Sequence, residues 1–270
     1  KEKIEITKQP LALQASRQNM KKFKHYMHQE IHEQPITLER SILHFWQDNA
    51  PSDNLLEALS AMPNNIKMLQ FIGCGSSHYA AMIGKYWFHN WSDWLVNCEI
   101  ASEFRYLTPN KVCPTMLIAL SQSGETADTL SAFLSEGAKK YDCKATLCNV
   151  PHSSLARASD IMLPILAGQE IGVASTKAFT NQLVLLLMFA LTQNTKHEVC
   201  KLINEIPSLI TSTLNLEADI ATVAAKLSQE QKMLFLGRGI MYPVALEGAL
   251  KLKELSYIHA HAYPAGELKH

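Results

Sequence analysis

From residue 67 onward, short apolar runs with the length of β-strands alternate with helical patterns, and no other feature constrains the fold as strongly. The apolar runs are KMLQFI, TMLIAL, ATLCNV and IMLPI, and the helical patterns occupy residues 78–88, 126–140 and 175–193. Strands that alternate with helices are typical of a mostly parallel sheet with helices on both faces. The sequence therefore predicts an α/β protein with a three-layer α/β/α fold and a parallel sheet.

The region before this alternation has a different character. Residues 1–22 are polar and lack sustained periodicity, so we predict a linker between domains. HYMHQEIHEQP then has a helical pattern, which we expect to end at Pro35 because proline interrupts a helix. A further helix is expected near residues 38–48. The sequence thus predicts a linker and two short helices ahead of the sheet.

Two segments of the chain resemble each other. FIGCGSSHYAAMIGKYW begins at Phe71, FLGRGIMYPVALEGALK begins at Phe235, and five positions match at a constant spacing of 164 residues. Glycine-rich turns are common in α/β proteins, so one alternative is a chance match and the other is a duplicated domain. A second copy would need about 150 residues to bury a core. We therefore expect a first domain at residues 23–205, the start of a second at 206–270, and a natural protein that continues beyond this end.

Composition and charge argue against several classes of protein. The formal net charge is zero and apolar residues make up 47% of the chain, which disfavours a nucleic-acid surface, a polybasic membrane anchor and a disordered chain. The longest apolar run, residues 183–191, is shorter than the roughly 20 residues that cross a bilayer. None of the six cysteines forms a CxxC motif. We therefore predict a reduced, cytoplasmic protein in which four of the six cysteines act as small apolar side chains.

The stretch LSQSGETADT places a glycine and several hydrogen-bonding side chains between a predicted strand and a predicted helix. The side chains with donors are Ser121, Gln122, Ser123 and Thr126. The first turn of a helix binds anions through free backbone N–H groups, and glycine allows a close approach. The turn has no Lys or Arg, so we predict that it holds a phosphate monoester through uncharged donors. An alternative remains in which a Ser or Thr only caps the helix.

Two further turns carry donors in similar positions. GCGSS, residues 73–77, follows the first strand, and Ser175, Thr176 and Lys177 of EIGVASTKAFT begin the last helix. The carboxyl ends of parallel strands share one edge of a sheet, so we expect the three turns to converge there. His78 occupies the third glycine position of a dinucleotide fingerprint, and GxxxxGK[ST] does not occur. No cofactor is predicted.

The helix predicted after GRG carries charged residues on one side. Glu247, Lys251 and Glu254 lie at i, i+4 and i+7 and so form one stripe. Periodicity alone favours a solvated face with an ion pair. The functional alternative is a carboxylate base beside an ammonium, which a sugar isomerisation needs. His259 and His261 form an HxH pair, but nothing nearby in the sequence completes a ligand set, so no metal is predicted.

Taken together, SQSGETADT, EIASEFRY, EIGVASTKAFT, LGRG and ALEGALKLKE…YIHAHAYPAGELKH closely resemble the glutamine–fructose-6-phosphate aminotransferase (isomerising), or glucosamine-6-phosphate synthase, family. The resemblance covers about residues 23–270, and single motifs are shared with the wider sugar isomerase (SIS) domain family. It implies a flavodoxin-like SIS fold in tandem, with an incomplete second copy. It also implies conversion of fructose 6-phosphate and glutamine-derived ammonia to glucosamine 6-phosphate, the first step of hexosamine and UDP-N-acetylglucosamine synthesis.

The resemblance also implies roles for individual residues. The residues that would bind the substrate are Ser77, Ser121, Gln122, Ser123, Thr126, Val173 and Ser175. Glu254 would move the proton between C1 and C2 of the sugar, with Lys251 beside it. His270 would open the fructose ring, and in the family this histidine reaches the site of the partner subunit. A homodimer is therefore expected.

The family has a glutaminase domain at its N-terminus, which is absent from this chain. A C-terminal lysine that forms a Schiff base with the sugar also has no counterpart here, so this fragment alone is expected to lack glutamine-dependent activity. The alternatives are another SIS phosphosugar isomerase, an aminosugar-phosphate deaminase, or a non-catalytic regulator that senses phosphosugars. A regulator would not need Glu254 and His270, and both are present.

Overall fold

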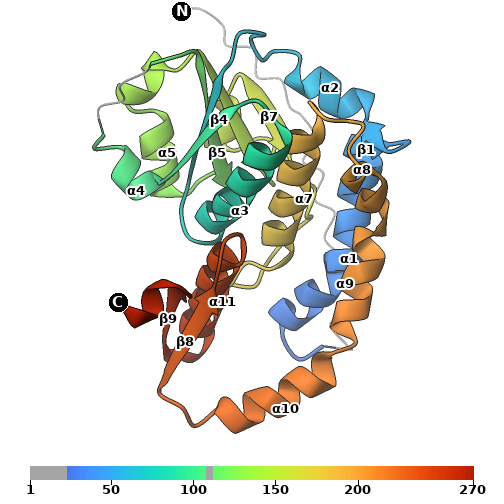
Figure 1. The fold of residues 1–270 in the computed structure, drawn as a ribbon, viewed down its shortest axis with the longest axis vertical. Coiled ribbons are helices and arrows are strands. Elements are labelled where there is room, and N and C mark those ends of the chain that lie inside the picture. Colours follow the sequence, from blue (N-terminus) through green and yellow to red (C-terminus); the bar gives the residue numbers. More distant parts are fainter. Residues whose placement is uncertain (1–22, 108–111) are drawn as a thin grey trace, which may run out of the picture.

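A five-stranded parallel sheet organises the first part of the chain (Figure 1). The computed structural model describes residues 23–107 and 112–270, so the predicted linker at 1–22 lies outside the described residues. The strands are β3 (Met68–Gly73), β4 (Leu95–Ile100), β5 (Thr115–Ser121), β6 (Cys143–Cys148) and β7 (Ile161–Pro164). Their order, β4-β3-β5-β6-β7, is parallel throughout and is the flavodoxin-like arrangement. The predicted parallel sheet is confirmed.

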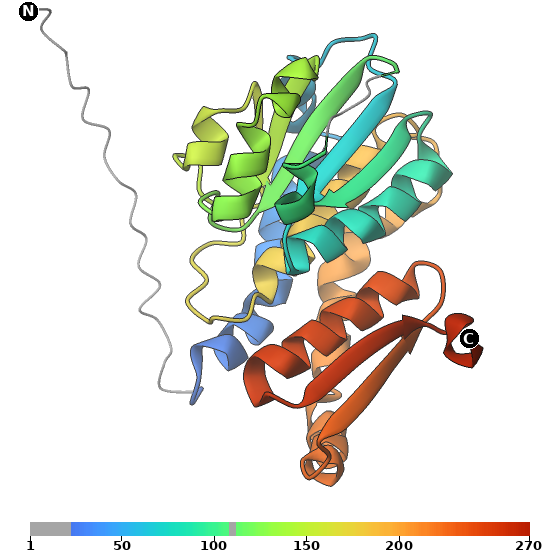
Figure 2. The same cartoon turned by 90° about the vertical axis from the view of Figure 1, so that its left-hand side faces the viewer.

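Helices cover both faces of this sheet (Figure 2). One face packs against α1 (Tyr26–Phe45), α3 (Ser76–Trp91) and α7 (Lys177–Leu191), and the other against α4 (Ala101–Phe104), α5 (Ala127–Phe133) and α6 (Ser154–Arg157). Along β5, Met116 and Ile118 join the first of these cores, while Leu117 and Ala119 join the second. This alternation follows from the period of two in a strand. The predicted three-layer α/β/α fold is confirmed.

The longest apolar run of the sequence lies in α7, where it is largely buried between the sheet and its neighbouring helices. It is therefore a core helix, as its length predicts. Within residues 23–107 and 112–270, no helix combines the length and apolar character that crossing a bilayer requires.

A smaller βαβ unit follows the first sheet. Strands β8 (Lys232–Gly237) and β9 (His259–Pro264) pair in parallel, and α11 (Met241–Ser256) connects them. α11 also packs against α3, which places the small unit beside the main sheet (Figure 2). The elements that lead from α7 to β8 are α8 (Val199–Leu202), η2 (Ile203–Glu205), α9 (Ile206–Leu214) and α10 (Glu217–Leu227). The remaining elements are β1 (Trp46–Gln47), β2 (Ala50–Pro51), α2 (Asp53–Leu59), η1 (Gly137–Lys140) and η3 (Glu267–Lys269).

The first helix corrects a prediction from the sequence. α1 continues through Pro35, so the two helices expected on either side of this proline are one helix. Proline lacks the N–H that would bond to the carbonyl of Ile31. The side-chain amide of Gln34 donates to that carbonyl instead, at 2.9 Å. A neighbouring side chain therefore satisfies the acceptor that the proline leaves free.

All six cysteines are free thiols, as the absence of a disulfide pattern predicts. Cys143, Cys148 and Cys200 are buried. Burial raises the pKa of Cys98 to about 12 and that of Cys143 to about 11. These thiols stay protonated near neutral pH and behave as apolar side chains.

Candidate functional site

The turn at residues 121–126 connects the end of β5 to α5. Ser121 is buried at its base, Gln122 and Ser123 are half-buried, and Thr126 is exposed. The hydroxyl oxygens of Ser121 and Thr126 are 3.2 Å apart. The structure thus brings together the hydroxyls that the sequence places in this turn.

Ser121 or Thr126 donates its hydroxyl hydrogen to the other, and the remaining hydroxyl hydrogens of this turn can be donated to a ligand. Ser121 Oγ accepts the N–H of Gly124 at 2.9 Å, and Ser123 Oγ accepts the N–H of Glu125 at 3.1 Å. Each oxygen acts as the acceptor, so these bonds do not consume the O–H hydrogen. Thr126 stands at the N-cap of α5, yet its side chain makes no capping bond. The capping alternative therefore does not account for Thr126.

Gly124 gives the turn its shape. Its φ is +69°, and a Cβ atom at this position would lie only 2.1 Å from Ser153 Oγ. The carbonyl of Gly124 accepts the N–H of Leu155, and the carboxylate of Glu125 accepts the N–H of Ser154 at 2.7 Å. The turn is thus packed tightly against the loop that begins α6, and only glycine fits.

The turn after β3 lies beside the 121–126 turn. β3 and β5 are neighbouring strands, and Thr129 of α5 contacts Cys74 through its hydroxyl and the thiol sulfur, at 3.7 Å. Gly75, with φ of +54°, precedes α3. Ser77 Oγ accepts a hydrogen bond from Gln182 of α7 at 3.0 Å. Two of the three predicted turns therefore meet at the carboxyl edge of the sheet.

The third predicted turn is held mainly by carboxylates of the protein itself. Glu170 accepts from Ser175 Oγ at 3.1 Å and from the backbone N–H of Thr176 at 2.9 Å. Lys177 is buried, and its ammonium pairs with Glu33 at 2.6 Å. Val173 is fully exposed. In the part of the chain that the structure describes, no hydrogen bond joins this segment to the 121–126 turn, so only the first two turns are directly linked.

The charged stripe on α11 faces the same edge of the sheet. Lys251 Nζ lies 2.7 Å from Glu254 and 3.5 Å from Glu247. Glu247 in turn accepts a hydrogen bond from Ser76 Oγ at 2.8 Å, and Ser76 is the first residue of α3. This bond joins residues 171 positions apart and fixes α11 against the turn that holds Ser77. Glu247 and Lys251 therefore do not lie on the solvated face that periodicity alone favoured, whereas Glu254 is exposed.

Glu247 is buried, and one oxygen of its carboxylate, Oε2, has no hydrogen-bond partner. Burial raises the pKa of Glu247, while the Lys251 ammonium and the Ser76 hydroxyl act in the opposite direction. Burial and the negative charge of Glu247 also raise the pKa of Tyr79. Glu254 differs in its surroundings, because 34% of its side chain is exposed. The two carboxylates that flank Lys251 therefore have different access to solvent.

His270 lies apart from the other predicted residues. It is exposed at the end of the chain, and its backbone N–H donates to the carbonyl of Glu267. Within residues 112–270, no side-chain contact joins it to Glu254 or to the 121–126 turn. The structure of one chain thus groups Lys251 and Glu254 with the turns but leaves His270 outside the group.

Sequence reasoning missed Ser76 as a contact of the α11 stripe, and it left Glu247 out of the predicted site. The signal in the sequence was incomplete: GCGSS indicates a polar turn, and the stripe indicates one helix face. Nothing in either segment shows that the two meet, because their contact depends on how α11 packs against α3.

Comparison with known proteins gives a consistent set of similarities. The model of the SIS domain family matches residues 64–192 and 226–270. A glutamine–fructose-6-phosphate aminotransferase [isomerizing] from Acinetobacter baylyi is 44% identical over 282 residues, which cover 99% of this chain and 46% of the relative. An aminotransferase of the same name from Shewanella oneidensis is 44% identical, with 92% of this chain and 42% of the relative covered. The chain thus spans less than half the length of the curated relatives.

A solved structure agrees with these relatives. The C-terminal domain of glucosamine-fructose-6-phosphate aminotransferase from Francisella tularensis superposes with a TM-score of 0.85 and 42% sequence identity. The superposition covers 94% of this chain and 73% of that chain. The similarity therefore extends over both the five-stranded sheet and the smaller βαβ unit.

Proposed function

Because the chain belongs to the SIS domain family, we propose that it is the sugar-isomerising part of an enzyme that makes glucosamine 6-phosphate from fructose 6-phosphate and glutamine-derived ammonia. The observation that carries this proposal is that the turn after β3 contacts both the α11 stripe, through Ser76 and Glu247, and α5, which follows the 121–126 turn, through Cys74 and Thr129. The 121–126 turn supplies uncharged donors for a phosphate, and the α11 stripe supplies a carboxylate beside an ammonium.

The phosphate would bind at the 121–126 turn. Donors are available from the hydroxyl of Ser123, from the amide of Gln122, and from whichever hydroxyl of Ser121 and Thr126 does not donate to the other. α5 has only seven residues, so these side chains and the adjoining backbone N–H groups matter more than the dipole of the helix. Binding the remote phosphate would position the reacting carbons and offset the entropy of orienting them.

The reaction would take place next to the α11 stripe. His270, reaching the site of the partner subunit in a homodimer, would promote opening of the fructose ring. Ammonia would then condense at C2 with loss of water. Glu254 would take a proton from C1 and return it to C2, which gives the aldose amine. Lys251, 2.7 Å from Glu254, would orient the carboxylate. Ser77, Val173 and Ser175 would line the sugar.

The proposal extends to organisation and location. We assign residues 1–22 to an interdomain linker, 23–205 to the first SIS domain and 206–270 to the start of a second. The partner that supplies ammonia would be a glutaminase domain of the same polypeptide. Six free thiols fit a reducing compartment, so the cytoplasm is the expected location.

A thermal unfolding experiment tests the phosphate site. Fructose 6-phosphate should raise the Tm because it binds the folded state, whereas fructose should leave it unchanged because it lacks the phosphate. Ser123→Ala should weaken fructose 6-phosphate binding by about 10- to 100-fold, since a hydrogen bond to a charged group contributes about 1.5–3 kcal/mol. Equal Tm shifts from the two sugars would show that the phosphate is not recognised.

A control variant separates binding from general stability. Ser212 lies on α9 and donates to the carbonyl of Ser208 in its own helix. Ser212→Ala removes a serine hydroxyl away from the proposed site. Its response to fructose 6-phosphate should match that of the unmodified chain.

A further inference from the structure

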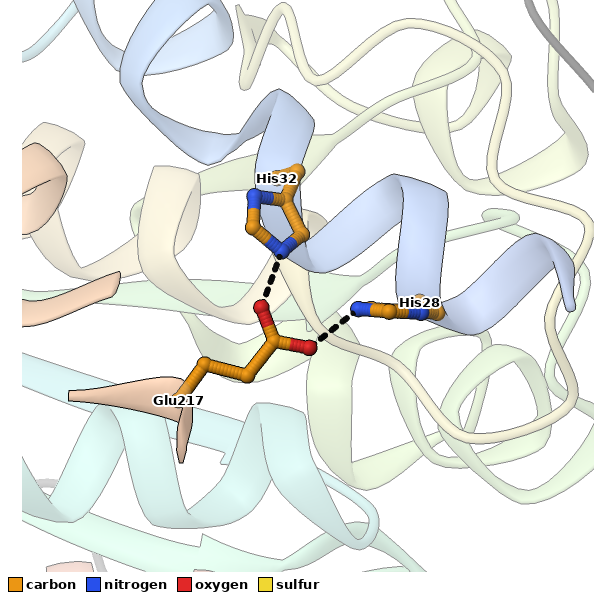
Figure 3. A group of neighbouring side chains, drawn as sticks. All are labelled: His28, His32 and Glu217. Carbon is orange, nitrogen blue, oxygen red and sulfur yellow. Dashed lines mark hydrogen bonds and ion pairs between the residues drawn. The ribbon is translucent and has the colours of Figure 1, made fainter. Parts of the chain in front are cut away.

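Two histidines of α1 and a glutamate of α10 form a cluster outside the proposed sugar site (Figure 3). His28 Nε2 lies 2.7 Å from one oxygen of Glu217, and His32 Nε2 lies 3.0 Å from the other. The three ligand atoms lie within 4.8 Å of one another. Two nitrogens and a carboxylate therefore converge on one point between the two helices.

The helix and its surroundings orient both imidazoles toward this point. His28 and His32 are four positions apart, so they lie on the same side of α1. The ring of Phe23 packs against both, with ring centroids 4.9 Å from His28 and 5.1 Å from His32. Both histidines are half-buried, while Glu217 is exposed. The cluster thus has a packed side and a side open to solvent.

The donor set has the chemistry of a transition-metal site. Imidazole nitrogen suits Zn²⁺, Cu²⁺ and Ni²⁺, whereas Mg²⁺ and Ca²⁺ prefer oxygen ligands. Zn²⁺ binds histidine nitrogen and carboxylate oxygen at about 2.0–2.2 Å, which separates tetrahedral ligand atoms by roughly 3.3 Å. The present spacing needs only small rotations of the side chains to reach that geometry. Three protein ligands would leave a fourth position for water.

Glu217 lies at the start of α10, so a metal bound to it would attach this helix to α1. Glu217 is the first residue of α10, a helix with no buried residue. In the described part of the chain, the side-chain hydrogen bonds that join α10 to another element are those that Glu217 accepts from His28 and His32. α10 leads directly into β8 and α11, so its attachment affects where the βαβ unit lies (Figure 1).

We propose that His28, His32 and Glu217 form a Zn²⁺ site that fastens α10 to α1. The site is independent of the proposed sugar chemistry. Its function is to hold the segment between the main sheet and the βαβ unit. The same three residues would bind Co²⁺, which gives the site a spectroscopic signature.

Calorimetric titration of the full chain, stripped of metal with a chelator, tests this proposal. One Zn²⁺ per chain should bind with micromolar or tighter affinity. His28→Ala and His32→Ala should each weaken binding by about 100-fold, because each removes one ligand. His25→Ala is the matched control, because His25 is an exposed histidine just before α1 and stands outside the cluster. A His259→Ala/His261→Ala background removes the HxH pair on β9, and the binding should persist in it.

A second measurement distinguishes a metal site from a cluster that is only hydrogen-bonded. Zn²⁺ should slow amide hydrogen exchange in residues 217–227, and Co²⁺ should give the visible absorption of a low-coordinate ion. His32→Gln retains a donor for Glu217 but is a poor zinc ligand, so it should abolish both effects. Binding only at millimolar Zn²⁺, or equal responses from His32→Gln and the unmodified chain, would overturn the proposal.

Discussion

Gly124 determines the backbone geometry of the proposed phosphate turn. Its positive φ would be strained in a residue that has a Cβ atom. In addition, Ser153 lies so close that a Cβ atom would have no space. The hydroxyls of Ser121 and Ser123 accept backbone N–H groups that this conformation presents. The donors of the turn therefore depend on the glycine as much as on the side chains.

Gly124→Ala is expected to lower the free energy of unfolding by about 3 kcal/mol or more, because a left-handed φ and a steric clash add together. Gly239→Ala is the control: its φ is +56°, but a Cβ there would meet nothing within 4 Å. It should lower the free energy by about 1–2 kcal/mol, the strain of the backbone alone. Urea denaturation measures both values. Equal losses would mean that the contact with Ser153 is not restrictive.

The buried carboxylate of Glu247 makes stability depend on pH. Burial raises its pKa in the folded state, so the folded protein binds this proton more tightly than the unfolded chain does. The contribution of Glu247 to stability should therefore be largest below the unfolded pKa of about 4.3 and should fall as pH rises through the folded pKa. Glu247→Gln should not lose this stability as pH rises, because glutamine does not titrate. Urea unfolding of both proteins across the acidic pH range would detect the difference.

Glu125 is a useful control because its pKa is shifted in the opposite direction to that of Glu247. A hydrogen bond from Ser154 lowers its pKa, so its contribution should be present above the unfolded pKa and lost as pH falls. Relative to Glu125→Gln, the unmodified chain should gain stability as pH rises. A difference between the unmodified chain and Glu247→Gln that does not vary with pH would contradict the assigned burial effect.

At the scale of elements, α1 shows how a helix can continue through a proline. Gln34 supplies the donor that Pro35 lacks, and this local exchange keeps α1 long enough to pack against α7 and α9. The same helix carries Glu30, which accepts the backbone N–H of Gly172, and Glu33, which pairs with Lys177. Continuity of α1 therefore positions the segment that begins α7.

A double-mutant cycle tests this role of Gln34. Gln34→Ala should lower the free energy of unfolding by about 1–2 kcal/mol, because it leaves the Ile31 carbonyl without a partner. In a Pro35→Ala background the loss should be small, since the new backbone N–H can donate to that carbonyl. Urea denaturation of the four proteins gives the coupling energy. Additive losses would show that Gln34 does not compensate for the proline.

Much of the fold can be predicted from the sequence because most of the strands are continuous apolar runs that are buried on both faces. β4 was missed because it is an edge strand that contains Asn97 and Glu99. In the sheet, Asn97 donates to Gln70 of β3, a partner that no local pattern reveals. The helix expected at 126–140 also proved shorter, as α5 ends at Phe133. Local patterns thus identify central elements better than edges and ends.

The same distinction applies to the candidate site. The 121–126 turn is local, so its composition and its place after a strand could be read directly. The bond between Ser76 and Glu247 joins distant segments and depends on packing. Likewise, the carboxylate that binds Ser175 is Glu170, which sequence reasoning did not consider. Residues that form a site within one segment are predictable, and contacts between segments require the structure.

For the whole molecule, the contact between α3 and α11 joins the two units at the edge where the turns lie (Figure 2). Glu247 makes this contact, and Glu254 extends the same stripe toward solvent. The proposed phosphate site and proposed base therefore belong to different units. The binding of a substrate that contacts both the phosphate turn and Glu254 would therefore depend on the relative position of the two units.

Glu254→Gln tests the division of roles in the complete enzyme that we propose. Replacing the base should lower kcat for glucosamine 6-phosphate formation by about 100-fold or more, because proton transfer by a positioned group contributes at least this much. Fructose 6-phosphate binding should persist, because the phosphate turn is unchanged. Product formation and calorimetric binding measure the two effects. Glu230→Gln, at an exposed position before β8, should leave both unchanged, and full turnover by Glu254→Gln would remove Glu254 from its role.

A crystal structure with fructose 6-phosphate tests the central claim most directly. The account predicts that the ester phosphate lies against the hydroxyls of Ser121, Ser123 and Thr126, with the sugar carbons directed toward Glu254. A phosphate bound elsewhere, with the 121–126 turn empty, would contradict it.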